Sequence, residues 1–373
     1  LQSCNLTNIN GCDSVAVLNL TITTCLDGCT DSLANNYNPF ATINDSTCLY
    51  SPFIFGCTDS TALNYNPLAT VDDSSCCYNS WNIIGSFYTP HVNYGSTVDL
   101  DSSGNIVVLG APGHNNSTGF ASVYDNSSGS WIQIGQNING ESTDDRFGTW
   151  VSISSNGNII AIGAPYNDGN GSDAGHVRVF ELISGSWTQI GQDIDGEAPG
   201  DISGRAISLN NNGNILAIGA RNNDGNGSNT YDSFGHVRVY QRFGNSWSQI
   251  GQDIDGSNAY DTFGHSVSLN SSGNIVAIGG DNNSNNGPLS GHVRVFEYIG
   301  GTWLQIGQSL NGEGDYDRSG CSVSINGLGN IVAIGADNND DNGGNSGHVR
   351  VYENISGTWV QLGIDINGEA GDD

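Results

Sequence analysis

The hydrophobic pattern of this chain repeats about every 56 residues from Trp81 onward. Each copy holds four short runs that are typical of strands, with Gly, Asn and Asp between them. In the second copy these runs predict strands at Trp150–Ser154, Asn158–Gly163, His176–Glu181 and Trp187–Ile190. A fixed period of this length indicates one supersecondary unit that is stacked many times.

The clearest landmark of the repeat is Trp-x-Gln-Ile/Leu-Gly. It begins at five tryptophans that are 56, 60, 56 and 56 positions apart: Trp131, Trp187, Trp247, Trp303 and Trp359. Four antiparallel strands per repeat predict an all-β protein with a β-propeller of four-stranded blades, five of them near complete. A right-handed β-solenoid is the rival fold, although its repeats are usually shorter and its strands are parallel. The predicted blades span about 81–135, 136–191, 192–251, 252–307 and 308–363, and the start of another lies at 364–373.

The four runs predict different positions within a blade. The first carries mostly small residues, which suits a crowded central channel, and the second is continuously apolar, as expected for a strand that is covered on both faces. The fourth carries the tryptophan, which we expect at the outer edge and the seam between blades. The third has the form Gly-His-Val-Arg-Val-aromatic and contains four recurring arginines: Arg178, Arg238, Arg294 and Arg350.

These arginines allow two interpretations. With one face of each strand presenting His, Arg and an aromatic residue, they could form a ligand-binding array. A residue that recurs in every blade more often serves the blade itself. We therefore expect each arginine to pair with a neighbouring acid, such as the recurrent Asp145, Asp201, Asp261 and Asp317.

A shorter repeat with a period of 28 precedes the propeller. Residues 28–50 and 56–78 are identical at 16 of 23 positions. A unit this small cannot bury enough apolar surface to fold alone, so we expect the disulfides Cys29–Cys48 and Cys57–Cys76, each contributing about 3 kcal/mol. The pairing of Cys4, Cys12, Cys25, Cys77 and Cys321 stays open. The predicted domains are a β-sandwich-like end at 1–27, Cys repeats at 28–55 and 56–80, and the propeller at 81–373.

Composition restricts the partners and the compartment. The formal charge is −29, and all nine basic residues are Arg. Nucleic acids and anionic membranes reward cationic proteins, so neither is an expected partner. Eight of the nine cysteines precede residue 78, which indicates an oxidising, extracellular location. No apolar run reaches the length of about 18 residues that predicts a membrane-spanning helix. Eleven Asn-x-Ser/Thr triplets also permit sugar attachment.

Calcium is the cofactor that the loops suggest. Between the second and third strands, oxygen-bearing side chains alternate with glycine and could wrap a hard cation. The candidate ligands are Asp168, Asn170, Ser172, Asp173, Asp224, Asn226, Asp337 and Asp341. Turns without metal have the same composition. The same two interpretations apply to Asp31, Asn38 and Asp45 in the first Cys repeat, and to Asp59, Asn66 and Asp73 in the second.

Phe147-Gly148, Phe263-Gly264 and Gly163-Ala164-Pro165 carry a family resemblance. The region resembles the FG-GAP repeats of the integrin α-subunit propeller and its bacterial relatives. One departure is that the turn before the second strand lacks the family's acidic calcium loop and reads Ser154-Ser155-Asn156-Gly157. The Cys repeats and the segment from Gly11 resemble modules of large secreted proteins of marine Bacteroidetes.

These resemblances imply an extracellular or cell-surface protein with a non-catalytic role in adhesion or appendage structure. Its expected partners are other surface proteins, copies of itself, or glycans, with no direct membrane insertion. No G-x-S-x-G, H-E-x-x-H or Cys/His metal spacing suggests an enzyme. A carbohydrate-binding propeller is the first alternative, which aromatic residues on one rim would favour. A propeller enzyme acting on polysaccharide is the second, which an acidic cleft unique to one blade would support.

The ring of blades is expected to be open. Trp81-Asn82-Ile83-Ile84-Gly85 matches a fourth strand without the three that should precede it, and the blade that opens near Gly368 stops at Asp373. We therefore expect an arc of five blades plus one orphan outer strand. The blades that would close the ring are expected beyond residue 373 or from another chain.

Overall fold

A computed structural model describes residues 27–48 with gaps at 33, 35–36 and 45, and then residues 55–60, 65–72, 95–225 and 232–371. The chain divides into two compact units, Leu1–Ile83 and Ile84–Asp373. Several earlier predictions lie outside the described residues: the β-sandwich-like segment up to residue 26, the orphan strand at Trp81, the Cys76 half of a disulfide, and the calcium candidates Asp45, Asp73 and Asn226.

Each Cys repeat contains one small parallel pair of strands. In the first, β1 (Asp27–Gly28) pairs with β2 (Ile43–Asn44), and in the second, β3 (Phe55–Gly56) pairs with β4 (Val71–Asp72). A disulfide joins Cys29 to Cys48, as predicted. Cys57 is also disulfide-bonded. The near-identical sequences therefore build the same small pairing twice.

The Asn-Tyr-Asn-Pro motif forms turns in both Cys repeats. The Asn38 side-chain oxygen accepts a hydrogen bond from the Phe40 backbone N–H at 3.0 Å, and Asn66 does the same for Leu68 at 3.0 Å. Asn and Asp favour turns because their side chains can bond the backbone two residues on. These amide oxygens are thus engaged in turns, which is the metal-free interpretation of the motif.

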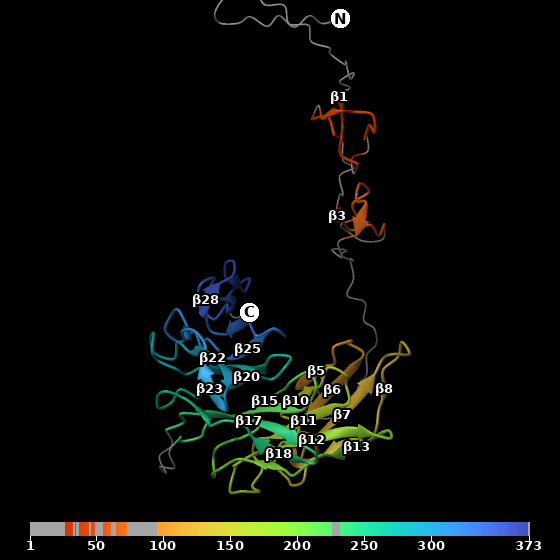
Figure 1. The fold of residues 1–373 in the computed structure, drawn as a ribbon. Coiled ribbons are helices and arrows are strands. Elements are labelled where there is room, and N and C mark those ends of the chain that lie inside the picture. The colour runs from red at the N-terminus through yellow and green to blue at the C-terminus, as the bar shows by residue number, and fades with distance from the viewer. Residues whose placement is uncertain are drawn as a thin grey trace, which may run out of the picture. The chain divides into compact units, whose positions relative to one another are not determined.

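The second unit consists of five repeated four-stranded antiparallel sheets, an all-β, propeller-like fold (Figure 1). The first strands are β5 (Thr97–Leu100), β10 (Trp150–Ile153), β15 (Ala206–Leu209), β20 (Ser266–Leu269) and β25 (Ser322–Ile325). The second are β6 (Ile106–Ala111), β11 (Ile159–Ala164), β16 (Ile215–Ala220), β21 (Ile275–Gly280) and β26 (Ile331–Ala336). The third are β7 (Phe120–Asp125), β12 (His176–Ile183), β17 (His236–Phe243), β22 (His292–Ile299) and β27 (His348–Ile355). The fourth are β8 (Ile132–Gln133), β13 (Ser186–Gln189), β18 (Ser246–Gln249), β23 (Thr302–Gln305) and β28 (Thr358–Gln361).

Each sheet also has a fifth, two-residue strand that the sequence pattern did not predict. These are β9 (Ile138–Asn139), β14 (Ile194–Asp195), β19 (Ile254–Asp255), β24 (Leu310–Asn311) and β29 (Ile366–Asn367). In the second blade, β13 pairs with the far half of β12, and β14 pairs with its start at His176 and Val177. Gly191, at a φ of 80°, lies between β13 and β14 and breaks the edge strand in two.

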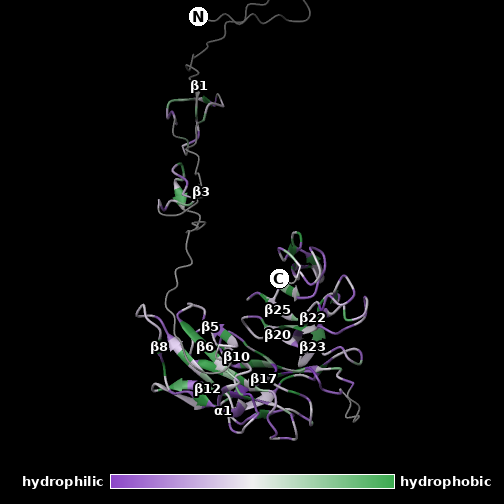
Figure 2. Ribbon diagram, turned by 180° about the vertical axis from the view of Figure 1, so that it is seen from behind, coloured by the Kyte–Doolittle hydropathy of each residue, from purple (hydrophilic) through white to green (hydrophobic). Residues whose placement is uncertain are grey.

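The apolar cores lie between neighbouring sheets. All six residues of β11 and of β16 are buried, as expected for strands covered on both faces. Four apolar clusters fill the seams between successive blades, and each contains a fourth-strand tryptophan: Trp187, Trp247, Trp303 and Trp359. Figure 2 shows the same contrast in hydropathy between strands and loops. A blade therefore has no core of its own and depends on its neighbours.

Small residues at the inner edge let the first strands bond to one another. The Ser152 hydroxyl accepts a hydrogen bond from the Leu209 backbone N–H of the next blade at 3.1 Å. Ser208 accepts one from Leu269 at 3.0 Å, and Ser268 one from Ile325 at 3.1 Å. A larger side chain at these serine positions would separate the inner strands.

The described blades form an open arc. The sheet β25–β28 stands apart from β5–β8 in both views (Figures 1 and 2). Val349 of the fifth blade is 37% exposed, whereas its counterpart Val293 in the fourth is fully buried. Ile366 is 62% exposed, against 3% for its counterpart Ile254. A hollow of about 440 Å³, lined in part by Gly335 and Ile366, lies on this uncovered face.

Candidate functional site

The outer seam between blades is held by tryptophan and glutamine. The Trp247 indole N–H donates to the Ile190 carbonyl of the preceding blade at 3.0 Å. Gln192, the last residue of the preceding Trp-x-Gln-Ile-Gly-Gln, donates to the Trp247 carbonyl at 2.8 Å and accepts from its N–H at 3.3 Å. The same contacts recur at the three other seams. The glutamine that follows Trp-x-Gln-Ile-Gly recurs in the sequence, so its role at the seam could have been predicted from that recurrence.

The recurrent arginines bind across the seam, but not to the predicted aspartates. Arg178 reaches the Asn139 carbonyl at 2.9 Å, on β9 of the preceding sheet, and Glu141 at 2.9 Å, in the loop between β9 and β10. Arg238 contacts Glu197 and Arg350 contacts Glu313 in the same way. The predicted partners Asp145, Asp201, Asp261 and Asp317 were wrong. For Arg178, Arg238 and Arg350 the true acid lies four residues earlier, in the loop that turns toward the arginine strand, whereas Arg294 donates to the Asp255 carbonyl and the Ser257 hydroxyl.

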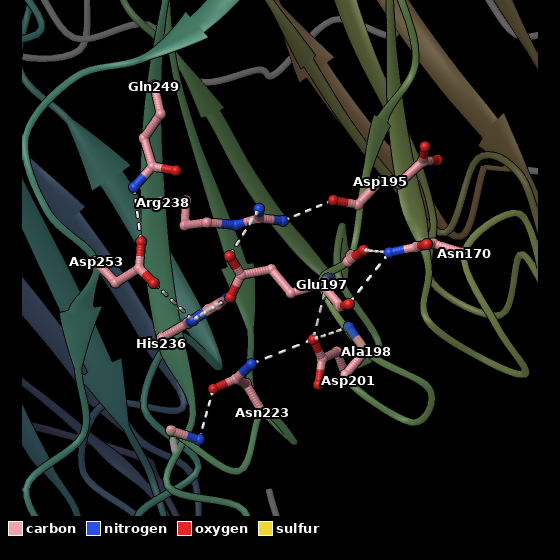
Figure 3. Close-up of polar contacts among 12 residues, drawn as sticks. Asn170, Asp195, Glu197, Ala198, Asp201, Asn223, His236, Arg238, Gln249 and Asp253 are labelled. Atoms are coloured by element: carbon pink, nitrogen blue, oxygen red, sulfur yellow. Dashed lines mark hydrogen bonds and ion pairs between the residues drawn. The ribbon is translucent and has the colours of Figure 1, made fainter. Parts of the chain in front are cut away.

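The predicted aspartates close their own loops instead. Asp201 is 3% exposed and accepts hydrogen bonds from the Ala198 N–H at 3.0 Å and from the Asn223 side chain at 3.2 Å (Figure 3). Asp145, Asp261 and Asp317 each accept from an equivalent asparagine: Asn167, Asn283 and Asn339. Burial raises the pKa of Asp201, with these hydrogen bonds opposing it. The carboxylate is thus used to order two loops at the seam.

In the second, third and fifth blades a buried histidine faces acids beside the arginine. In the third blade, the His236 Nδ1 lies 3.8 Å from Glu197 and 4.0 Å from Asp253, while Gln249 donates to Asp253 at 2.6 Å (Figure 3). Burial lowers the pKa of His236 to about 4 and raises the pKa of Glu197. The imidazole is therefore neutral near pH 7.

The fourth blade holds the same histidine without the acids, because Ser257 and Ser309 replace them. Burial lowers the pKa of His292 to about 4, below the ordinary value of about 6.5. The neutral His292 side chain contributes fully to stability above pH 6.5. This contribution is lost as the pH falls toward 4, because the unfolded state is protonated at a higher pH than the folded state. Between pH 6.5 and 4, the free energy of unfolding of the wild-type chain should therefore fall about 2 kcal/mol further than that of His292→Gln. Urea titrations of both proteins at pH 7, 5.5 and 4.5 measure these free energies. An equal dependence on pH in the two proteins would contradict the prediction.

The predicted calcium ligands of the propeller that the structure describes lie in the loops between the second and third strands, on the same rim as the histidine groups. Asp168 accepts a hydrogen bond from the Asp173 N–H at 2.9 Å, and Asp224 accepts one from the Asp232 N–H at 3.1 Å. The Asn170 amide bridges to the next loop at the Gly196 carbonyl, 2.8 Å away (Figure 3). Calcium at these loops stays a prediction. Asp341 differs from the others because it joins a histidine.

One group of side chains breaks the repeat, and the sequence reasoning missed it. Near the starts of the first strands, Arg221 lies 3.3 Å from His265, and His265 lies 3.3 Å from Asp281. Arg318 contacts Asp281 at 2.6 Å. The corresponding positions differ from blade to blade, which could have been seen by aligning the residues after Phe-Gly and Gly-Ala.

This group is better suited to holding blades together than to catalysis. The Asp281 side chain is only 2% exposed, and besides Arg318 and His265 it accepts a hydrogen bond from Thr262 at 2.7 Å. Burial lowers the pKa of His265. The burial of this carboxylate and its three contacts with protein side chains suit a cross-link between blades.

The fold and these repeated seams define the class of protein as an all-β, propeller-like repeat protein. Residues 139–180 match the family model of the FG-GAP repeat. That segment contains Glu141, Asp145, Phe147 and Arg178, whereas Gln136 and Trp187 of the same seam lie outside it. No curated protein matches the chain.

Among solved structures, a proposed 6-phosphogluconolactonase from Bacteroides uniformis aligns with 73% of this chain and 71% of its own, at 15% identity and a TM-score of 0.49. A similarity at this level carries no argument about activity.

Proposed function

We propose that this chain is a non-catalytic structural or adhesive module of an extracellular surface protein, with other surface proteins or copies of itself as partners. The observation that carries the proposal is what the recurring polar residues contact. The recurring Arg, Trp and Gln are directed at the neighbouring blade, and the recurring Asp closes loops within its own repeat, so these residues maintain a rigid scaffold. Function on such a scaffold is left to its exposed rims.

A disulfide and the family match support an extracellular location. The Cys29–Cys48 disulfide fits an oxidising compartment, and FG-GAP repeats are typically extracellular. Among the described residues there is no helix long and apolar enough to cross a membrane. The resemblance of the Cys repeats to spacers of secreted proteins supports a place within a larger surface protein.

Retention of coated beads under flow tests the adhesive role. Beads carrying the full chain should stay on polysaccharide gels or on surfaces coated with the same protein at shear that removes beads carrying heat-unfolded chain. Equal retention would contradict adhesion. Release of reducing sugar from the polysaccharides by the purified chain would contradict the non-catalytic part.

Two exposed tyrosines favour a second candidate, carbohydrate binding. Tyr260 is 61% exposed and Tyr316 is 57% exposed, and they occupy the same loop position in successive repeats. Both have positive φ, 66° and 68°, where the third repeat has Gly200. A bulky residue held in this conformation is a genuine outlier that invites a functional explanation. Exposed aromatic faces of this kind are suited to stacking on sugar rings.

A glycan array with the double variant Tyr260→Ala/Tyr316→Ala tests this candidate. We expect the wild-type chain to bind a defined set of glycans and the double variant to lose at least tenfold in apparent affinity. Tyr298→Phe is the matched control, because that ring packs on Trp303 at 5.1 Å. Absence of any glycan signal above background for the wild-type chain would exclude this role for the glycans on the array.

A further inference from the structure

We propose that the fifth blade binds one divalent transition-metal ion of the Zn²⁺ type. The ligands are one imidazole and three carboxylates: Glu313, Asp341, His348 and Asp365. One ligand atom from each of these four side chains lies within 4.8 Å of the others. The proposal goes beyond the adhesive role and does not depend on it.

His348 is the observation that distinguishes this group from an ordinary acidic cluster. Its side chain is 1% exposed, and its Nδ1 is buried without a hydrogen-bond partner. The nearest carboxylate oxygen, on Asp341, lies 4.0 Å away, too far for a hydrogen bond. A buried polar atom left unpaired costs about 1–3 kcal/mol, so this nitrogen calls for a partner.

The spacing of the donors suits an ion. Zn²⁺ binds His nitrogen and carboxylate oxygen at about 2.0–2.2 Å. Ligand atoms around a tetrahedral ion with such bonds lie about 3.4 Å apart. The 4.0 Å between the His348 Nδ1 and the Asp341 oxygen is thus reached by a small side-chain rotation of Asp341, which is exposed.

The charges also call for a divalent cation. Arg350 contacts one oxygen of Glu313 at 3.1 Å, and Gln361 donates to one oxygen of Asp365. The second oxygen of each carboxylate is left for an ion. Three carboxylates against one guanidinium leave two negative charges beside a buried imidazole, and one divalent cation balances them. An imidazole nitrogen among the ligands favours a transition metal over Ca²⁺, which takes oxygen ligands.

Among the residues that the structure describes, the four-ligand set occurs in the fifth blade alone. Where Asp341 stands, the second and third blades have Gly169 and Gly225, and the fourth has Asn285. The second and third blades keep three-residue groups, Glu141 with His176 and Asp193, and Glu197 with His236 and Asp253. The fourth blade has the buried His292 without carboxylates at the equivalent positions. We therefore expect the fifth-blade site to be the tightest, and the fourth blade to serve as an internal control.

Isothermal titration of the full chain, freed of metal with a chelator, tests the proposal. We expect one tightest Zn²⁺ site per chain, with Ca²⁺ failing to displace Zn²⁺ at equal concentration. Asp341→Asn should weaken that site at least tenfold. It should leave the metal-free thermal unfolding curve unchanged, because the described contact of the Asp341 carboxylate is the one with His348. His292→Gln, in the fourth blade, should leave binding unchanged.

Cobalt supplies a readout that affinity alone does not. The Co²⁺-loaded wild-type chain should show visible absorption bands typical of a low-symmetry site with a nitrogen ligand, and His348→Gln should abolish them. Three results would each overturn the proposal: no Zn²⁺ site tighter than those that survive in Asp341→Asn, Co²⁺ bands that persist in His348→Gln, or tighter binding of Ca²⁺ than of Zn²⁺.

Discussion

Trp303→Ala is expected to lower the free energy of unfolding of the propeller by about 3–5 kcal/mol. The indole is 2% exposed and belongs to the core between the third and fourth blades. Its N–H donates to the Ile250 carbonyl at 2.9 Å, and Tyr298 packs against the ring. Alanine would leave a large cavity at the seam and an unpaired carbonyl beside it.

The neighbouring Leu304 is a matched control, since it lies on the same strand but is 48% exposed. Leu304→Ala should change the unfolding free energy by less than about 1 kcal/mol. Urea denaturation followed by tryptophan fluorescence and by far-ultraviolet circular dichroism measures both variants. Similar losses for the two would contradict the assignment of Trp303 to the seam.

Gly279→Ala is expected to destabilise the protein by about 3 kcal/mol or more, the upper end of what overpacking costs. A Cβ at Gly279 would lie 2.1 Å from the Gly320 carbonyl oxygen of the next blade. A backbone carbonyl held by its own sheet cannot rotate aside as a side chain can. The blades would have to separate along β20–β25.

Gly335 provides the control because it occupies the same position in the uncovered fifth blade. A Cβ there meets the Ser322 hydroxyl at 2.4 Å, just as one at Gly279 meets the Ser266 hydroxyl at 2.4 Å, but no next-blade carbonyl lies near it. Differential scanning calorimetry of the two variants should show a clearly smaller fall in melting temperature for Gly335→Ala. Equal falls would mean that the seam carbonyl is not the cause.

The repeated strands were predictable because burial on both faces leaves a direct mark on the sequence. The apolar run from Ile159 to Ala164 predicts a strand that is covered on both faces. The short β14 was missed because two residues, Ile194 and Asp195, carry no period that could be recognised. Its existence depends on Gly191 interrupting the edge strand, and a single glycine has many other uses.

The residues of the seam were easier to predict from the sequence than the contacts that they make with one another. Arg178 was recognised as a residue that serves the blade, but Glu141 and Asp145 are both acids of the same loop. Only the path of that loop decides which carboxylate faces the arginine and which turns back to Asn167. The approach of His348 to acids from three separate segments is likewise a property of the assembled fold, which spacing along the chain cannot reveal.

The serine contacts between inner strands make the arc a one-dimensional array, in which each blade is stabilised by at most two neighbours. Such an array has a stability close to the sum of its nearest-neighbour seams, so its ends open more readily than its middle. Backbone amides of β26 should therefore exchange with solvent deuterium faster than those of β16, although the two strands are nearly identical in sequence. Thermal fraying would start from the terminal blades of the described arc and progress inward one seam at a time.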